Sequence, residues 1–385
     1  MTGNDLGIKE SNVILSNQKN LKKFKFTSGF YSGIHEKYPG SGYIDFHKSN
    51  LFVLSSRGVL AFNNKLENKA NFKQIKNNIG EFIGGEQYRK DYRLSIKDLS
   101  IIKDKIFISF TEEIEDNCWN TSIIMGNINY KFINFKKLFS AKELVNEKFR
   151  YAKCIHADGT NGEFQPHQSG GRIFSFDDNN ILFSTGEYRT RVLAQNEKSV
   201  NGKIIKININ DSSYKIISMG HRNPQGLYVD RENNFIIETE HGPMGGDEIN
   251  VIEIEKDKVQ NFGWPIASYG EHYGGRNKSN KLKYEQFPLL KSHSDNGFIE
   301  PIKAFVPSIG ISEIIKIGDN KYVVGSMRGR ALYFFELNNR RELKNLTKIK
   351  VGERIRDLKF KENNLYMFLE DTASIGLINI KESHF

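Results

Sequence analysis

A short apolar run, a polar turn and a second apolar run recur six times along the chain. The turns are rich in Asn, Asp, Gly and Lys, which favour tight turns, and the runs are rich in Ile, Val, Phe, Tyr and Leu, which favour strands. Each copy therefore predicts a β-hairpin. The six copies occupy residues 43–55, 98–110, 172–184, 226–238, 313–325 and 357–369.

Each hairpin is followed by a third strand-like run, such as GKIIKIN at 202–208 and RALYFFEL at 330–337, and some by a fourth, such as YKIISM at 214–219. Six units of four strands are typical of a six-bladed β-propeller. The pattern therefore predicts an all-β fold in which four-stranded antiparallel blades surround a central funnel. We expect residues 1–385 to form one such domain.

The two ends of the chain predict how the ring closes. The last unit ends soon after its third strand, whereas residues 12–26 hold two spare strand-like runs, NVILS and KKFKF. We therefore expect the N-terminal segment, residues 1–26, to complete the last blade and close the ring. Closure of this kind protects the sheet edges that would otherwise be open.

Composition narrows the choice of partners. Hydrophobic residues make up 38% of the 385 residues and the net charge is +10, with the basic residues scattered through polar turns. This excess of basic over acidic residues predicts either a solvated surface or an anionic partner. No basic helix or known nucleic-acid motif occurs, so we expect no nucleic-acid partner. No apolar run approaches the roughly 20 residues of a membrane span, so we expect no transmembrane segment.

Cysteines and the N-terminus bear on the compartment. Cys118 and Cys154 have neither metal-ligand nor redox spacing, so they either pair in an exported protein or are unrelated buried thiols. Residues 1–23 lack the apolar core of a signal peptide. The chain is thus either the mature form of a periplasmic or secreted protein or a cytosolic protein.

Propeller topology predicts where unusual residues meet. The loops entering the first strand of each hairpin and those leaving the second strand open on one face, around the funnel. They contain His167, Glu187, His221, Arg222, Arg328, Arg354 and Arg356 and the segment GPMGG at 242–246. Several guanidiniums on one funnel imply a polyanionic ligand. A histidine near a carboxylate can act as a general base, and backbone carbonyls freed by glycines suit calcium.

Several of these segments resemble the signature segments of the PQQ-dependent glucose/sorbosone dehydrogenase family, which includes the soluble aldose sugar dehydrogenases. The resemblance covers roughly residues 165–371. Any one of its motifs alone would be a weak signal, but together they are specific to the family. The motifs are HQSGGRI (167–173), HRNPQGL (221–227), EHGPMGGDEIN (240–250), NFGWPIASYG (261–270) and RIRDL (354–358). It implies a propeller that oxidises an aldose with pyrroloquinoline quinone (PQQ) held on calcium, and passes electrons to an external acceptor.

The resemblance assigns catalytic roles to three residues. His167 matches the base that takes the proton from the anomeric hydroxyl while hydride passes to the quinone. Glu187 matches a position, often Asp, that orients this histidine. Arg222 and Asn223 match the residues beside the reactive quinone oxygen, where Arg222 would stabilise growing negative charge.

The resemblance also assigns binding roles. Arg354 and Arg356 match the pair that binds the PQQ carboxylates, and Arg328 stands where glucose-oxidising relatives typically have Lys. The main-chain carbonyls of Gly242 and Pro243 match the ligands of the calcium ion. This sequence departs from the family at Pro166, where some relatives have an acid, which argues against glucose itself.

The sequence departs more strongly from the family in the segment before the second hairpin. The family's glycine- and leucine-rich segment, source of another cofactor contact, is not recognisable in EQYRKDYRLSIKDL at 86–99. Gln87 and Arg93 are the candidates to replace it. The missing segment favours a second interpretation, a non-catalytic propeller that uses the same funnel or rim as a binding module. A six-bladed hydrolase of the lactonase type is a third, disfavoured because its carboxylate and amide ligands are not evident.

Overall fold

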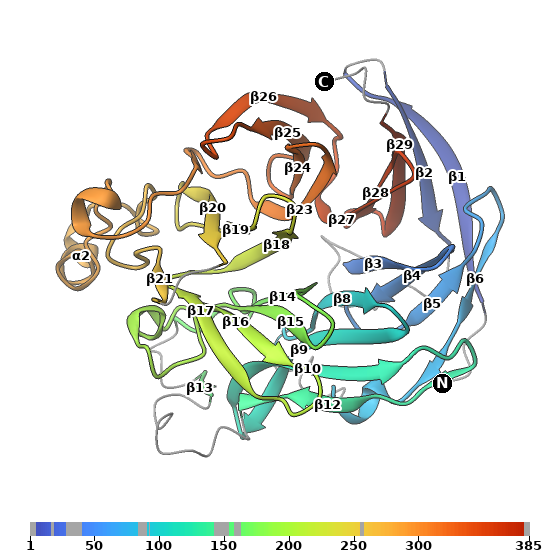
Figure 1. Cartoon of the computed structure of the whole chain (residues 1–385), viewed down its shortest axis with the longest axis horizontal. Coiled ribbons are helices and arrows are strands. Elements are labelled where there is room, and N and C mark those ends of the chain that lie inside the picture. Colours follow the sequence, from blue (N-terminus) through green and yellow to red (C-terminus); the bar gives the residue numbers. More distant parts are fainter. Residues whose placement is uncertain are drawn as a thin grey trace. The chain divides into compact units, whose positions relative to one another are not determined.

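The computed structural model of the chain is built mostly of β-strands (Figure 1). It describes residues 5–16, 19–27, 41–83, 91, 93–141, 154–157, 163–254 and 258–380. Its helices are short: α2 (Lys281–Gln286), η1 (Ile79–Glu81), η5 (Arg191–Gln195), η6 (Lys278–Asn280) and η7 (Ser294–Asn296). Within these ranges, none of the helices has the length and hydropathy to span a membrane.

All six predicted hairpins are present. In five of them the turn contains a residue at positive φ, a conformation common in tight hairpin turns: Lys48, Lys103, Asn234, Asn320 and Asn363. The hairpin strands are β3 (Gly42–His47) and β4 (Asn50–Ser55), β8 (Ile96–Ile102) and β9 (Lys105–Glu115), β14 (Gly170–Ser175) and β15 (Asn180–Thr185), β18 (Pro224–Asp230) and β19 (Phe235–Glu240), β23 (Ile311–Gly318) and β24 (Lys321–Ser326), and β27 (Ile355–Lys361) and β28 (Asn364–Leu369).

A third strand follows each hairpin, again as the sequence predicts. These strands are β5 (Leu60–Asn63), β10 (Cys118–Asn127), β16 (Lys203–Asn208), β20 (Asp247–Glu253), β25 (Ala331–Leu337) and β29 (Ser374–Asn379). The other strands are β1 (Leu6–Ile14), β2 (Asn20–Phe26), β6 (Asn71–Gln74), β7 (Lys76–Asn77), β11 (Phe132–Ile133), β12 (Lys136–Phe139), β13 (Ile155–His156), β17 (Tyr214–Met219), β21 (Gln260–Asn261), β22 (Lys303–Phe305) and β26 (Leu343–Lys350). The predicted all-β class is therefore confirmed.

The chain divides into two compact units. The first unit comprises Met1–Ile108, Ile124–Lys137 and Ser312–Phe385, and the second comprises Ser109–Ile123 and Leu138–Ile311. The prediction of a single domain with one funnel concerns both units together and stays a prediction.

The first unit contains a nine-stranded sheet in the order β27-β28-β29-β2-β1-β6-β5-β4-β3 and a four-stranded sheet in the order β23-β24-β25-β26. Strand β2 pairs antiparallel with β29, with Phe24 opposite Ile375. The N-terminal strands thus extend the sheet of the last hairpin. Phe24 and Phe26 are buried in one core cluster with residues of that sheet, and their spacing of two residues explains the apolar positions of KKFKF.

The second unit contains the sheets β14-β15-β16-β17-β21 and β18-β19-β20-β22. Their core includes Leu182, Ile204, Leu227 and Ile236. Each sheet begins with a hairpin strand whose entering loop carries a predicted site residue.

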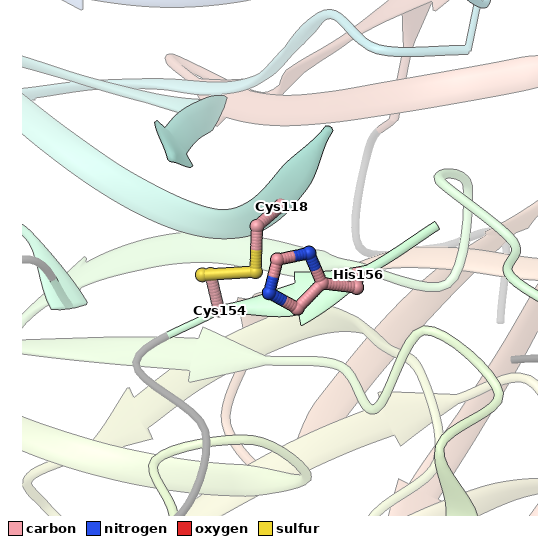
Figure 2. A group of neighbouring side chains, drawn as sticks. All are labelled: Cys118, Cys154 and His156. Carbon is pink, nitrogen blue, oxygen red and sulfur yellow. A yellow bond between two sulfur atoms is a disulfide. The ribbon is translucent and has the colours of Figure 1, made fainter. Parts of the chain in front are cut away.

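Cys118 and Cys154 form a disulfide in the second unit. The bond joins the start of β10 to the segment that carries β13, which pairs with β10 through Cys118 and His156. Figure 2 shows the His156 ring beside the two sulfurs. Because both sulfurs are bonded to each other, this group leaves only an imidazole as a metal ligand.

Candidate functional site

His167 lies in the loop that enters β14, and the loop leaving β15 holds it in place. The His167 side chain is exposed, whereas Pro166 and Gln168 on either side are buried. The amide of Tyr188 donates to the Gln168 carbonyl at 2.9 Å, and the amide of Gln165 donates to the Tyr188 carbonyl at 3.1 Å. The two loops therefore lie side by side, with His167 presented to solvent.

Gly186 allows this close approach. A Cβ at position 186 would lie 2.1 Å from the Gln168 carbonyl oxygen, a contact that no side chain tolerates. The loop leaving β15 therefore needs glycine where it crosses the loop that carries His167.

Glu187 follows this glycine and is fully buried. Burial raises the pKa of its carboxyl to about 7, although the positive charges of Arg222, Arg191 and Arg189 and the Arg189 amide oppose the shift. Within the described part of the chain, neither carboxylate oxygen has a hydrogen-bonding partner. The orientation of His167 by Glu187 therefore stays a prediction.

Arg222 lies in the loop that enters β18 and is held on three sides. Its amide donates to Glu240 Oε2 at 2.5 Å, and Nη1 donates to the carbonyls of His241 at 2.9 Å and Gly242 at 2.7 Å. The guanidinium also lies 5.4 Å from the centre of the Trp264 ring, a cation–π contact. Arg222 is therefore fixed next to one of the predicted calcium ligands.

Asn223 points its side-chain oxygen at backbone. Asn223 Oδ1 accepts from the Gly170 amide at 3.1 Å and from Gln225 Nε2 at 3.0 Å. Because the oxygen is occupied, the Nδ2 group is the part of the carboxamide that remains to donate to a ligand. The contact with Gly170 also ties the Arg222 loop to the His167 loop.

The loop of Gly242 and Pro243 is a tight backbone turn. A Cβ at position 242 would lie 2.0 Å from the Gly246 carbonyl oxygen, so glycine is required. Asp247 Oδ1 accepts from the Gly242 amide at 3.2 Å, and Ser308 Oγ lies 3.5 Å from the Pro243 carbonyl oxygen. Carbonyl oxygens have two lone pairs, so both can still bind a hard cation such as calcium.

Buried carboxylates lie behind this loop, and the sequence analysis did not select them. Glu240 Oε1 accepts from His221 Nδ1 and from Asn250 Nδ2, both at 3.1 Å, and Asn250 Nδ2 also reaches Glu238 Oε2. Burial raises the pKa of Glu238 and of Glu248 well above the ordinary value, and the nearby charge of Glu240 adds to both shifts. Glu240 and Glu248 also line a small cavity with Arg222 and Gly242. A cation in this cavity would favour the ionised form of these carboxyls and lower the raised pKa of Glu248.

In the first unit, Arg354 and Arg356 converge on one carboxylate. Arg354 Nε donates to Glu370 Oε2 at 2.9 Å and Arg356 Nη2 donates to Glu370 Oε1 at 2.8 Å. The two guanidiniums outweigh burial and lower the pKa of Glu370 to about 2. Both arginines keep part of their surface exposed, 19% and 16% of the side chain. They can therefore still receive an anion from solvent.

Arg328 lies between β24 and β25 with an exposed side chain. Met327, its neighbour, contacts Arg354 through its sulfur, at 3.4 Å from Arg354 Nη2. The loop that carries Arg328 therefore lies next to the arginine pair.

The segment before β8 contributes further cations. Arg93 pairs with Asp91, Arg57 Nη1 donates to the Leu94 carbonyl at 3.0 Å, and Lys97 Nζ donates to the Arg93 carbonyl at 2.8 Å. Sequence reasoning considered Arg93 but missed Lys97, which looks like an ordinary polar position of a strand. Gln87, the other candidate, lies outside the described residues.

The structure thus gathers the predicted residues in two groups. His167, Glu187, Arg222, Asn223, Gly242 and Pro243 lie on connected loops of the second unit; in the first unit Arg328 and Arg354 lie on neighbouring loops and Arg356 on β27. The roles of these residues, a base and carbonyl ligands in the second unit and guanidiniums for carboxylates in the first, stay predictions.

Comparison with known proteins confirms the resemblance seen in the motifs. Residues 103–379 match the glucose/sorbosone dehydrogenase family, and the chain belongs to this family. The aldose sugar dehydrogenase YliI of Escherichia coli is 27% identical over 303 residues, which cover 72% of each chain. An uncharacterised Synechocystis protein, slr1608, is 27% identical over 220 residues, which cover 49% of this chain and only half of that relative.

A solved structure shows the same fold. The PQQ-bound aldose sugar dehydrogenase of Streptomyces coelicolor superimposes with a TM-score of 0.63 at 16% identity, covering 94% of this chain and 98% of that one. The chain is thus an all-β protein with the fold of the PQQ sugar dehydrogenases, within a family of sugar oxidoreductases.

Proposed function

We propose that the protein is a six-bladed β-propeller, closed by its N-terminal segment, that oxidises an aldose at the anomeric carbon to the lactone with calcium-bound PQQ. The observation that carries the proposal is the arginine pair. Arg354 and Arg356 face one buried carboxylate, so two full positive charges share one negative charge, and each guanidinium remains partly exposed. Planar guanidinium forks of this kind suit carboxylates, of which PQQ has three.

The residues of the second unit fit the calcium ion as well. The carbonyls of Gly242 and Pro243 are hard oxygen ligands, and the buried carboxylates Glu240 and Glu248 line the cavity beside Gly242. The Gly242 carbonyl also accepts a hydrogen bond from the guanidinium of Arg222, so this oxygen already faces a positive charge.

The chain's own residues would divide the chemistry as follows. His167, exposed on its loop, takes the proton from the anomeric hydroxyl as the carbonyl of the lactone forms. Arg222, fixed by Glu240 and by the Gly242 carbonyl, supplies positive charge where negative charge develops. Arg328, Arg354 and Arg356 bind carboxylates, and Asn223 donates from Nδ2. PQQ, when bound, supplies the quinone that accepts the hydride and later passes two electrons to an external acceptor.

The disulfide supports a place outside the cytosol. Structural disulfides persist in oxidising compartments such as the periplasm or the extracellular space. We therefore propose that the protein is periplasmic or secreted.

A non-catalytic binding module is the second candidate function. Glu370 already neutralises part of the charge of Arg354 and Arg356, as a purely structural ion-pair network would. A module of this kind has no use for a base on the His167 loop, so loss of turnover on replacing His167 separates the two functions.

Calorimetric titration with PQQ tests the proposal. We expect binding in the presence of calcium and much weaker binding after addition of a chelator, because the carbonyl ligands of Gly242 and Pro243 need the hard cation. As a control, Arg340→Ala removes an exposed arginine of the first unit that is not among the proposed site residues, and it should bind PQQ like the wild type. Absence of PQQ binding with and without calcium would exclude the cofactor and leave the binding module.

A further inference from the structure

Lys97 joins the cations of the first unit from a strand that the family motifs do not include. It lies on β8, which contacts β3, and β3 in turn contacts β27, the strand that carries Arg356. The positive charge of Arg356 acts on Lys97, which shows that the two groups are near each other. Lys97 as a whole is half-buried.

The segment that leads into β8 holds Lys97 in place. Lys97 Nζ donates to the Arg93 carbonyl at 2.8 Å, and Arg93 in turn pairs with Asp91. Arg57, which follows β4, fixes the same segment through the Leu94 carbonyl at 3.0 Å. The ammonium is therefore positioned by backbone carbonyl contacts, near the arginine group but on a different segment of the chain.

Several cations gather in this part of the first unit: Arg57, Arg93, Lys97, Arg354 and Arg356. Arg93 forms an ion pair with Asp91, and Arg354 and Arg356 form ion pairs with Glu370. Lys97 donates instead to a neutral carbonyl. Burial, with Arg356 and Arg57 adding to it and Asp91 opposing it, lowers the pKa of Lys97 to about 7.

We propose that Lys97 is an anion-binding residue of this site and donates to a carboxylate of the bound cofactor, where other family members use the glycine- and leucine-rich segment before the second hairpin. The inference rests on the proposed function, since it takes PQQ as the anion. A carboxylate beside Lys97 would relieve the repulsion from Arg356 and Arg57 and give the ammonium a charged acceptor in addition to the Arg93 carbonyl.

Proton uptake is the readout that separates anion binding from a structural role. At pH 8 most of the Lys97 amines are neutral, and an adjacent carboxylate raises the pKa of the amine, so binding should take up a proton. Calorimetry of PQQ binding with calcium, in two buffers of different ionisation enthalpy, measures this uptake. We expect the wild type to take up a large fraction of one proton per PQQ, from a pKa of about 7.

Three variants sharpen the test. Lys97→Gln keeps a donor for the Arg93 carbonyl; we expect it to fold, to take up no proton at pH 8 and to raise the Kd about 10-fold at pH 6.5, where Lys97 is charged. Lys97→Arg keeps the charge at every pH, so we expect binding without proton uptake. Lys136→Met removes an exposed lysine of the first unit and should behave like the wild type.

Binding of isophthalate, a plain aromatic dicarboxylate, distinguishes a failure of this inference from a failure of the proposed function. If isophthalate binds with proton uptake that depends on Lys97 while PQQ does not bind, the anion site stands and the cofactor assignment falls. If PQQ binds to folded Lys97→Gln with wild-type affinity and wild-type proton uptake, Lys97 is outside the site. If neither anion binds to the wild type, both the inference and the cofactor assignment are overturned.

Discussion

Two buried glutamates lie just after the second strand of a hairpin and differ in their surroundings. Glu187 is the second residue after β15 in the second unit, and Glu370 is the first residue after β28 in the first. Glu370 accepts hydrogen bonds from two guanidiniums, and its pKa falls to about 2. Glu187 has arginines nearby but no such bonds, and burial raises its pKa to about 7. A buried carboxylate is thus kept ionised where guanidiniums lie close enough both to attract it by their charge and to donate hydrogen bonds to it.

The contrast extends to the regions around them. The first unit gathers cations near Glu370, and the second has carboxylates of raised pKa, Glu238 and Glu248, behind the Arg222 loop. Both regions are built on hairpins of one kind, and their charged residues lie on strands as well as in loops, as Arg356 does on β27 and Glu238 on β19. One kind of repeat can therefore supply an anion site or a cation or proton site by changing a few residues.

The largest expected effect tests the second unit alone. His167→Gln removes the proposed base, so turnover should fall by roughly 10²-fold or more while PQQ and calcium stay bound. The measurement is oxidation of a panel of aldoses with an artificial electron acceptor, on protein whose cofactor content is checked by absorbance. His156→Gln, an exposed histidine of the same unit, is the control and should keep full activity. Equal rates for His167→Gln and the wild type would contradict the mechanism even if the cofactor binds.

A smaller effect is expected in the first unit. Arg356→Ala should weaken PQQ binding by about 1.5 to 3 kcal/mol, the range for a hydrogen bond to a charged group. Arg354 remains to hold Glu370, so the fold should survive. Titration by calorimetry measures the affinity, and circular dichroism checks the fold. Unchanged affinity in a natively folded variant would place Arg356 outside the cofactor site and restrict it to the ion pair.

The sequence predicted the strands better than the partners within the site. The hairpins were predictable because turn residues and apolar runs are local signals, and the topology of a propeller then placed His167, Arg222 and Arg356 on loops of one kind. The choice of Glu370 as the partner of Arg354 was not predictable locally, since the adjacent Glu353 and Asp357 are closer in sequence. A signal did exist: Glu187, Glu240 and Glu370 all stand where the second strand of a hairpin ends, opposite the loop that enters the first strand. No pattern in the sequence singled out Lys97 as a site residue, because a lysine at this position of a strand is expected to face solvent.

Glu187→Gln should have the smallest effect on turnover. It is also the sharpest test of the comparison between Glu187 and Glu370. It keeps the shape of the side chain and should lower turnover less than His167→Gln does, because the base remains. Stability should respond in the opposite sense. A carboxyl whose pKa rises from 4.5 unfolded to about 7 folded holds its proton in the folded state, so the wild type loses stability as the pH rises from 4.5 to 7. The loss is about 3 kcal/mol at most, from 1.36 kcal/mol per pKa unit.

Glutamine has no proton to lose, so Glu187→Gln should match the wild type in free energy of unfolding near pH 4.5 and exceed it at pH 8. Urea denaturation at the two pH values measures the difference, and Glu232→Gln, an exposed control, should show none. The equivalent change at the ion-paired position, Glu370→Gln, should destabilise the protein at pH 8, because its carboxylate is held ionised by Arg354 and Arg356. Opposite signs for the two variants follow from the opposite directions of the two pKa shifts. The same sign would mean that Glu187 is ionised in the folded protein and that the contrast between the two units does not hold.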